Sequence, residues 1–371
     1  MKKRLLLLFA ILANSILISY AVAPQERLKV GLVLGGGGAK GAAEVGVLKT
    51  IEALDIPIDY IAGTSIGAIV GGLYACGYHA DDLDKLFREQ EWLSLIGDRN
   101  KDLRDHIIDQ RDGTTYILGF PIGRTKKDTT SVTTGLGILN GDHITHLLDS
   151  LTSAYNGIES FDQLPIPFRC VAVDFKTQEE VIMDSCEIEL AMRASMAIPG
   201  AFKPVKWKGH TLVDGGMMNN LPVDVVKAMG ADVVIAIDLQ QEQHEERDFS
   251  LKETFGIGGL LDWAVSRPDW KKNKANREDA DVYICPDLDK YSVSSFGENS
   301  IDSMIELGER AGQAAKEKLL LLKRMVFKGQ RINLVGKACT VKSNSLPLWH
   351  EIRDPLACHP PRCAYRQFRR D

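Results

Sequence analysis

The chain has 371 residues and a formal net charge of −5, with 44% hydrophobic and 26% charged residues. This composition is that of a globular protein with one large or two modest α/β domains, and it argues against a chain-wide basic surface for nucleic acid. The charge is uneven, because residues 326–371 carry nine Lys or Arg and three Asp or Glu, a local balance of +6 that leaves −11 on residues 1–325.

The N-terminus has the pattern of a secretory signal peptide. Lys2, Lys3 and Arg4 precede the apolar run 5–18, and Ala21-Val22-Ala23 forms a small-x-small cleavage site before Pro24. The run is shorter than the roughly 20 residues of a transmembrane helix, although an uncleaved anchor is the alternative. We therefore expect residues 1–23 to be removed and the chain to be exported, to the periplasm, the periphery of the outer membrane or the medium.

The chain contains seven cysteines, and four of them lie in apolar segments, where they are expected to act as small buried hydrophobic side chains: Cys76, Cys170, Cys186 and Cys285. Cys339, Cys358 and Cys363 lie in the basic tail. Export would permit disulfides, but the spacing assigns no pair. A fourth ligand at zinc-finger spacing is missing beside Cys358-His359 and Cys363, so no metal site is predicted.

The first elements are a strand, a glycine loop and a helix. Residues 28–34 (LKVGLVL) predict a buried strand, and apolar residues at helical spacing predict a helix over 42–54. The loop between them, GGGGAKG (35–41), is not a P-loop, because Lys40 is followed by Gly41 rather than by Ser or Thr.

Two interpretations of the glycine loop remain open. Gly36-x-Gly38-x-x-Gly41 matches a dinucleotide-binding fingerprint, for which Asp55 or Asp59 could bind the ribose. Alternatively, successive glycine N–H groups form an anion-binding turn suited to the oxyanion of an acyl-transfer intermediate.

The second landmark is Gly63-Thr64-Ser65-Ile66-Gly67, which follows an apolar, strand-like segment and precedes a helical one. This is the pattern of a nucleophile elbow. Gly63 and Gly67 lack the bulk that would obstruct a tight turn. The helix N-terminus after Ser65 favours a developing negative charge. A serine in this position, about one βα unit after the glycine loop, favours the oxyanion-hole interpretation of that loop.

The remaining pattern predicts alternating helices and strands, and therefore a mostly parallel sheet with helices on both faces. Residues 98–135 are irregular and predict a surface excursion or a lid. No structure is assigned after Met325, where a loosely ordered extension or a membrane-surface patch are the alternatives. The predicted helices are 73–96 (with Asp81 as a cap), 141–151, 187–196, 222–229 and 301–322, and the predicted strands are 168–175, 181–183, 202–206, 210–213, 233–239 and 281–285.

Asp214-Gly215-Gly216 ends the strand at 210–213 and is either an Asx turn or a catalytic carboxylate on a sharp turn. A Ser–His–Asp arrangement would need a histidine at a strand end. His244, His350 and His359 are not so placed, and His210 precedes Asp214 by four residues. A Ser–Asp dyad, in which Asp214 accepts the proton of Ser65 directly, therefore fits better.

Four motifs in order, GGGAKG (36–41), GTSIG (63–67), SMAIPGAF (195–202) and DGGMMNNLP (214–222), resemble those of the patatin-like phospholipase family in its bacterial, exported branch. The resemblance covers about residues 28–240. It implies a three-layer α/β/α fold with a mostly parallel central sheet. It also implies Ser65 as nucleophile, Asp214 as general base and an oxyanion hole at residues 36–41, with Gly37, Gly38 and Ala39 N–H as donors. Lys40 stands where the family has Lys or Arg, while Glu44 departs from the His that is frequent in bacterial members.

The implied function is that of a serine lipid acyl hydrolase of phospholipase A, lysophospholipase or esterase type, with acyl-ester lipids as substrates, contact with a membrane surface, and no cofactor or nucleic acid. The implied domain is 24–325, with its motifs in 28–240 and a helical part at 250–325, followed by the tail 326–371. Two alternatives remain: a nucleotide-binding oxidoreductase that uses the glycine loop, and a non-catalytic membrane-binding module.

Overall fold

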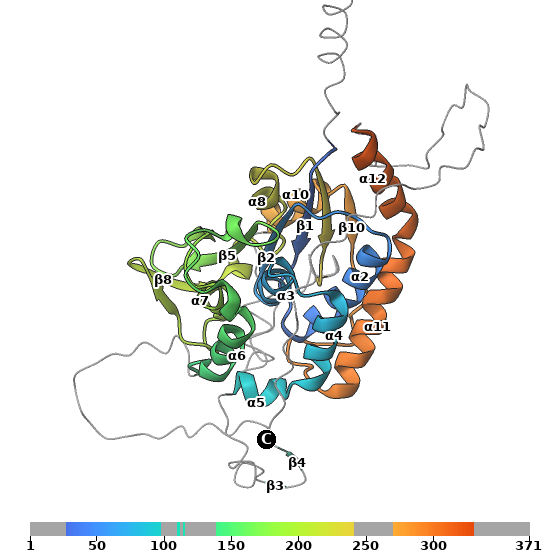
Figure 1. The fold of residues 1–371 in the computed structure, drawn as a ribbon. Coiled ribbons are helices and arrows are strands. Elements are labelled where there is room, and N and C mark those ends of the chain that lie inside the picture. Colours follow the sequence, from blue (N-terminus) through green and yellow to red (C-terminus); the bar gives the residue numbers. More distant parts are fainter. Residues whose placement is uncertain (1–26, 98–109, 112–113, 116–138, 241–269, 330–371) are drawn as a thin grey trace, which may run out of the picture. The chain divides into compact units, whose positions relative to one another are not determined.

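The computed structural model describes residues 27–97, 110–111, 114–115, 139–240 and 270–329 (Figure 1). The predictions for the signal peptide, for nearly all of the irregular stretch 98–135 and for the tail beyond Gly329 lie outside the described residues. Between 98 and 138 the structure describes the strand pair β3 (Gln110–Arg111) and β4 (Thr114–Thr115).

The core of the fold is an eight-stranded mixed sheet in the order β10-β9-β1-β2-β5-β8-β7, with β6 also paired to β5. The strands from β10 to β5 are parallel, whereas β6, β8 and β7 join in antiparallel fashion. The bounds are β1 Val30–Leu34, β2 Tyr60–Thr64, β5 Phe168–Asp174, β6 Glu179–Met183, β7 Val205–Trp207, β8 His210–Asp214, β9 Val233–Ile237 and β10 Val282–Ile284. This confirms the predicted, mostly parallel sheet.

Helices cover both faces of the sheet (Figure 1). Because successive side chains of a strand point to opposite faces, Val33 packs in one cluster with Val223 and Val226 of α8, while Leu32 and Leu34 belong to the cluster on the other face. The fold is thus the expected three-layer α/β/α arrangement. The helices are α2 (Ala42–Ala53), α3 (Ile66–Ala75), α4 (Ala80–Glu89), α5 (Trp92–Ile96), α6 (Asp142–Thr152), α7 (Ile188–Ser195), α8 (Val223–Ala228), α10 (Trp270–Glu278), α11 (Glu298–Ala314) and α12 (Lys316–Lys328).

Two helices predicted as continuous are divided. The segment 73–96 contains the end of α3, then α4 and α5, because Gly77 turns the chain with φ +98° and Gln90 is extended. His79, not Asp81, caps α4, and its N–H donates to the Asp82 carboxylate at 3.1 Å. The segment 301–322 is interrupted at Ala315.

Two further predictions meet the structure in part. Helix α12 continues to Lys328, so that the first three residues of the predicted tail are helical, and Val326 is buried. Cys76 and Cys170 are buried as expected, while Cys186 and Cys285 are only half-buried.

Within the described residues, no helix is long and apolar enough to cross a bilayer.

The register of the parallel strands sets the position of the site. Leu34 at the end of β1 lies opposite Gly63 of β2 and Ile237 of β9. The glycine loop and the serine turn therefore leave the sheet side by side, at the carboxyl edge where α/β proteins bind their ligands.

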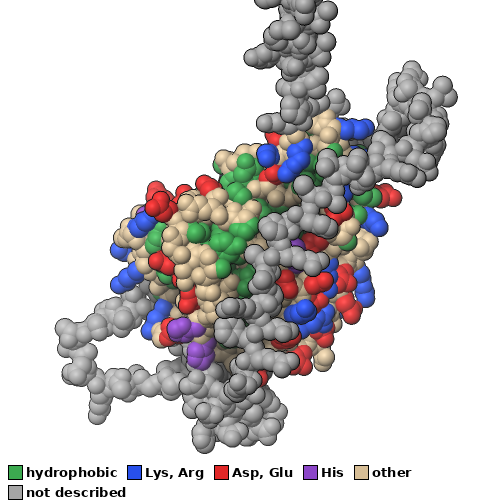
Figure 2. Space-filling model, viewed as in Figure 1, with side chains coloured by type: hydrophobic (Ala, Val, Ile, Leu, Met, Phe, Trp, Pro, Cys, Tyr) green, Lys and Arg blue, Asp and Glu red, His purple; other side chains and the backbone are tan. Residues whose placement is uncertain are grey.

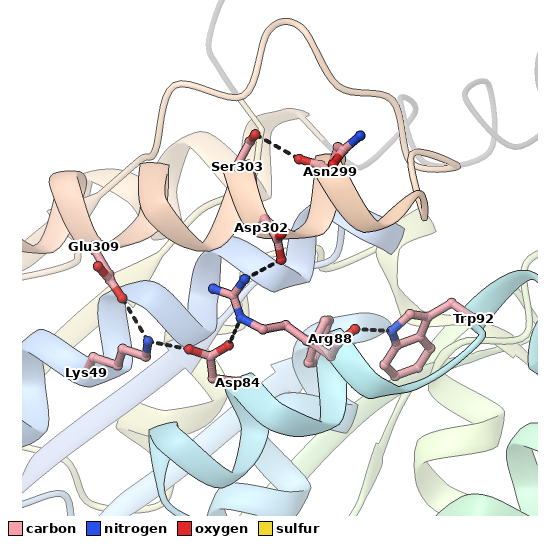
Figure 3. A network of polar contacts seen from close by, with 9 residues as sticks. Lys49, Asp84, Arg88, Trp92, Asn299, Asp302, Ser303 and Glu309 are labelled. Atoms are coloured by element: carbon pink, nitrogen blue, oxygen red, sulfur yellow. Dashed lines mark hydrogen bonds and ion pairs between the residues drawn. The ribbon is translucent and has the colours of Figure 1, made fainter.

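A network of charged side chains joins α2, α4 and α11 on the helical layer (Figure 3). The carboxylate of Asp84 contacts both Lys49 and Arg88. Lys49 also contacts Glu309 at 2.8 Å, and Arg88 contacts Asp302. On this side of the molecule, acidic and basic side chains are interspersed over the surface (Figure 2). Asp84 lies at the centre of the network and links three helices.

We expect the Asp84→Asn variant to lower the free energy of unfolding at pH 7 by about 1–3 kcal/mol, because two cations lose a partner whose side chain is only 14% exposed. Burial raises the pKa of Asp84, but the hydrogen bonds from Lys49 and Arg88 outweigh it and lower the pKa overall. The stabilisation is therefore present above the ordinary pKa of an aspartate and is lost as pH falls through the lower folded pKa. Urea unfolding between pH 7 and pH 3 measures this difference.

Asp302→Asn is the matched control for this variant. Asp302 contacts the same Arg88, but its side chain is 49% exposed, against 14% for Asp84. An exposed pair of this kind contributes about 1 kcal/mol or less. Equal losses in the two variants would contradict the central role of Asp84.

Candidate active site

Ser65 lies on a strained turn between β2 and α3. Its backbone has φ 55° and ψ −121°, a conformation that residues with a side chain rarely adopt. A Cβ at Gly63 would lie 2.3 Å from the carbonyl oxygen of Gly67, and a Cβ at Gly67 would lie 2.3 Å from that of Leu34. The two motif glycines are thus required by close backbone approach, as predicted for a nucleophile elbow.

Asp214 contacts Ser65 directly. The Ser65 hydroxyl donates to Asp214 Oδ2 at 2.8 Å, across 149 residues of sequence. Gly216 N–H donates to the other oxygen, Oδ1, at 2.7 Å. The Asx turn is therefore present, and it holds one carboxylate oxygen while the other faces the hydroxyl of Ser65. Gly215 begins the short helix η5 (Gly215–Met217) and lies against Val171.

Burial makes Asp214 a stronger base than an ordinary aspartate. The residue is only 4% exposed. This burial raises the pKa of Asp214 to about 6, although the hydrogen bonds from Gly216 and Ser65 act in the opposite direction. Near neutral pH the carboxylate is ionised and its pKa is close to the ambient pH, which suits a group that accepts and returns a proton.

The histidine nearest to Asp214 in the sequence has another partner. His210 Nδ1 lies 2.7 Å from Asp174 Oδ2. His244, His350 and His359 lie outside the described residues. The carboxylate of Asp214 is accordingly the titratable group found in hydrogen-bonding contact with Ser65 in the described part of the chain.

Ser195 is hydrogen-bonded to the backbone of the turn that carries Ser65. The N–H of Ser65 donates to Ser195 Oγ at 2.9 Å, and the Ser195 hydroxyl donates to Val171 O at 2.6 Å. Ser195 is fully buried, so its hydroxyl satisfies an amide that would otherwise lack a partner. Sequence reasoning assigned it no role, although it is the first residue of the SMAIPGAF motif.

Hydrogen bonds fix most of the glycine loop. Gly35 N–H donates to Ile237 O at 3.0 Å and Gly36 N–H to Asn220 O at 3.1 Å. Lys40 N–H donates to Gly37 O at 3.2 Å, within the short helix η1 (Gly38–Gly41). Gly41, the last residue of η1, packs against Ile66 of α3.

Gly37 and Gly38 have the N–H groups that remain available as donors. Neither donates to an acceptor in the part of the chain that the structure describes. The expectation for Ala39 as a third donor is wrong, because its N–H donates to Val293 O at 2.9 Å. Two adjacent free amides next to Ser65 are the arrangement that an oxyanion hole requires.

The acids proposed for a dinucleotide ribose lie at the wrong end of the sheet. The Asp59 carboxylate binds Arg27 and the N–H of Val30, which is the first residue of β1. The glycine loop follows Leu34, the last residue of the same strand. Asp55 follows the end of α2, whose start adjoins the loop. The geometry therefore contradicts the dinucleotide interpretation of these residues.

An apolar cavity of about 160 Å³ opens beside Ser65 and Gly38. Its walls come from α3, α5, α6, the segment after α7 and the segment before α11, and they are almost entirely hydrophobic. Leu93 at its wall is 55% exposed. Such an apolar lining has the chemistry that suits a hydrocarbon chain. The other main lining residues are Ile66, Ile69, Trp92, Ile96, Leu139, Ile144, Met196, Ile198, Ala201, Phe202, Val293 and Phe296.

The family model and the relatives that match this chain are named as phospholipases or lysophospholipases. The family model described as patatin-like phospholipase matches residues 32–227. Patatin-like phospholipase domain-containing protein 7 of Rattus norvegicus is 29% identical over 309 residues, which cover 77% of this chain and 20% of the relative. Lysophospholipase NTE1 of Mycosarcoma maydis is 34% identical over 216 residues, covering 57% and 10%. The chain thus spans a fifth or less of these relatives.

Similar solved structures include two bacterial proteins. VipD from Legionella pneumophila has 16% sequence identity and a TM-score of 0.39, covering 76% of this chain and 67% of that one. ExoU, in the ExoU–SpcU complex of Pseudomonas aeruginosa, has 17% identity and a TM-score of 0.42, covering 80% and 52%.

Proposed function

Since this chain belongs to the patatin-like phospholipase family, we propose that it is a serine lipid acyl hydrolase that cleaves fatty-acyl esters through Ser65 and Asp214. The observation that carries the proposal is the 2.8 Å hydrogen bond from Ser65 Oγ to Asp214 Oδ2 beside an apolar cavity. The family supports the reaction class, and the cavity supports a hydrocarbon chain as the acyl group.

The mechanism is acyl transfer in two steps. Ser65 Oγ attacks the ester carbonyl carbon while its proton passes to Asp214 Oδ2. The carbonyl oxygen becomes an oxyanion, which the N–H groups of Gly37 and Gly38 stabilise. The bond to the alcohol breaks, and Asp214 returns the proton to the departing oxygen. Water then attacks the acyl-serine, gives a proton to Asp214, and the fatty acid leaves as the proton returns to Ser65.

We further propose that the chain is exported and works at a membrane surface. Support for export comes from the signal-peptide pattern of residues 1–23. Support for membrane contact comes from the exposed side chain of Leu93 at the apolar cavity.

Covalent labelling with a fluorophosphonate tests the proposed function. We expect the wild-type protein to be labelled and to hydrolyse lysophospholipid or p-nitrophenyl acyl esters, because an activated serine attacks both the fluorophosphonate and an acyl ester. Ser65→Ala should lose labelling and reduce turnover to the background rate. Ser94→Ala, which changes the exposed hydroxyl that contacts Glu91, is the control and should label normally. Wild-type protein that neither labels nor turns over would contradict the proposal.

A further inference from the structure

Asn220 joins the glycine loop to the Asp214 turn. It is 2% exposed and follows η5 by three residues. Its backbone oxygen accepts the N–H of Gly36 at 3.1 Å, and its side-chain Nδ2 donates to the oxygen of Gly36 at 3.0 Å. A single residue therefore binds both polar backbone groups of Gly36, the residue directly before the two free amides.

The rest of the side chain lies against the Asp214 turn. Asn220 Oδ1 is fully buried and accepts no hydrogen bond within the described residues. A Cβ at Gly36 would lie 2.3 Å from this oxygen, and a Cβ at Gly216 would lie 2.7 Å from it. The Asn220 amide thus fills the space that two motif glycines leave open, one in each loop. The N–H of that same Gly216 binds Asp214 Oδ1.

The backbone of Asn220 is itself held in place. Its N–H donates to Asn273 Oδ1 of α10 at 3.2 Å, and Asn273 is 2% exposed. Through this contact α10 fixes the backbone of Asn220, which in turn is hydrogen-bonded to the glycine loop.

We propose that Asn220 is a positioning residue that sets the distance between the oxyanion-binding amides and the Ser65–Asp214 pair. The inference rests on the proposed function, since it assigns a duty within that reaction. Oxyanion donors act at about 2.7–3.1 Å from the developing charge, so a small displacement of the loop weakens them in the transition state more than in the ground state. No group on Asn220 takes part in the chemistry itself.

Asn219 provides a matched control. It is an equally buried asparagine, one position earlier in the chain. Its side-chain Nδ2 donates to Glu180 and Asp224, and its Oδ1 accepts from Asn276. These partners do not belong to the glycine loop or to the Asp214 turn. Asn219→Ala therefore loses buried hydrogen bonds, and so stability, without releasing the loop.

Kinetics of Asn220→Ala and Asn220→Asp test the proposal. We expect kcat to fall about tenfold to a hundredfold in both variants, part of what removal of a whole oxyanion donor costs, with KM changed by less than about twofold. Affinity for an alkyl trifluoromethyl ketone, whose adduct with Ser65 carries an oxyanion, should fall by the same factor as kcat/KM. Asn219→Ala, assayed at a temperature where it is folded, should retain the wild-type kcat. Asn220→Asp keeps the shape of the side chain and serves if Asn220→Ala does not fold.

Hydrogen exchange gives a readout that does not depend on catalysis. The peptide that covers the glycine loop should exchange faster in Asn220→Ala than in wild type and in Asn219→Ala, while peptides from α3 remain unchanged. Equal kcat in the Asn220 and Asn219 variants, or a loop with unchanged exchange, would overturn the inference. Absence of Ser65-dependent turnover in the wild type would contradict the proposed function instead, and the exchange comparison would still decide whether Asn220 holds the loop.

Discussion

Asp214→Asn should lower kcat for acyl-ester hydrolysis by about 10²- to 10⁴-fold, the range that a general base contributes. The amide has the shape of the carboxylate and can still accept the N–H of Gly216, but it cannot take the proton of Ser65. Steady-state hydrolysis of a p-nitrophenyl acyl ester measures the loss. A variant that retains a tenth or more of the wild-type kcat would show that another group acts as the base.

The pH dependence of the wild type follows from the same carboxylate. Because burial raises the pKa of Asp214 to about 6, we expect kcat/KM to rise with pH through about 6 and to level off above pH 7. Protonation below pH 6 removes the acceptor, so activity at pH 5 should be about a tenth of the plateau. The residual activity of Asp214→Asn should lack this rise. A rise centred near pH 4 would contradict the effect of burial.

As pH rises, the contribution of Asp214 to the stability of the fold should fall, whereas the activity should rise. Asp214 binds its proton more tightly in the folded state, with a pKa of about 6 against the ordinary 3.8. Its contribution to stability is therefore present below pH 3.8 and is lost as pH rises through 6. We expect Asp214→Asn to be more stable than the wild type at pH 8, by up to about 3 kcal/mol, with no gain below pH 4. Urea unfolding at the two pH values measures the difference.

Asp59→Asn is the control with the opposite sign. Burial raises the pKa of Asp59, but the hydrogen bonds from Arg27 and from the N–H of Val30 prevail and lower it overall. This carboxylate stabilises the fold above its unfolded pKa, so its replacement should destabilise the protein at pH 8. The same sign of change in both variants would contradict the argument.

Local patterns predicted the elements close to the site well. The helix expected over 42–54 runs from Ala42 to Ala53, and the elbow lies at Ser65. Both depend on signals within a few residues: glycines where the backbone must turn, and apolar spacing between them. The Ser65–Asp214 pair was predictable because each residue stands in a recognisable motif at the end of a strand. How the two carboxylate oxygens divide between Gly216 and Ser65 was not predictable.

The features that sequence reasoning missed depend on contacts between distant segments. Ala39 is unavailable as a donor because Val293, from the segment before α11, accepts its N–H. Ser195 and Asn220 have small polar side chains whose importance follows from the particular backbone atoms that they reach. A pattern in one segment gives no information about such partners. The motifs that contain these residues indicated only that the segments mattered.

Gly38→Pro should lower kcat by about 10²- to 10³-fold, the effect of losing one oxyanion donor. Proline has no N–H, so one of the two free amides disappears. Gly38 also has φ +57°, whereas proline requires about −65°, and a Cβ at this position would lie 2.4 Å from Val293 O. The loop must therefore shift as well as lose a donor. The measurement is kcat for acyl-ester hydrolysis, together with the affinity for an alkyl trifluoromethyl ketone.

Gly209→Pro is the control that distinguishes the loss of an oxyanion donor in Gly38→Pro from the effect of backbone strain. Gly209 also has a positive φ, of +86°, but it lies in the turn between β7 and β8, where an added Cβ would meet no neighbouring atom of the described residues within 4 Å. Both variants force a left-handed residue out of its conformation, and both should lose stability. Only Gly38→Pro should lose kcat and ketone affinity in the folded protein. If Gly38→Pro kept the wild-type kcat, the N–H of Gly38 would not be an oxyanion donor, and the proposed pair of donors among the described residues would be wrong.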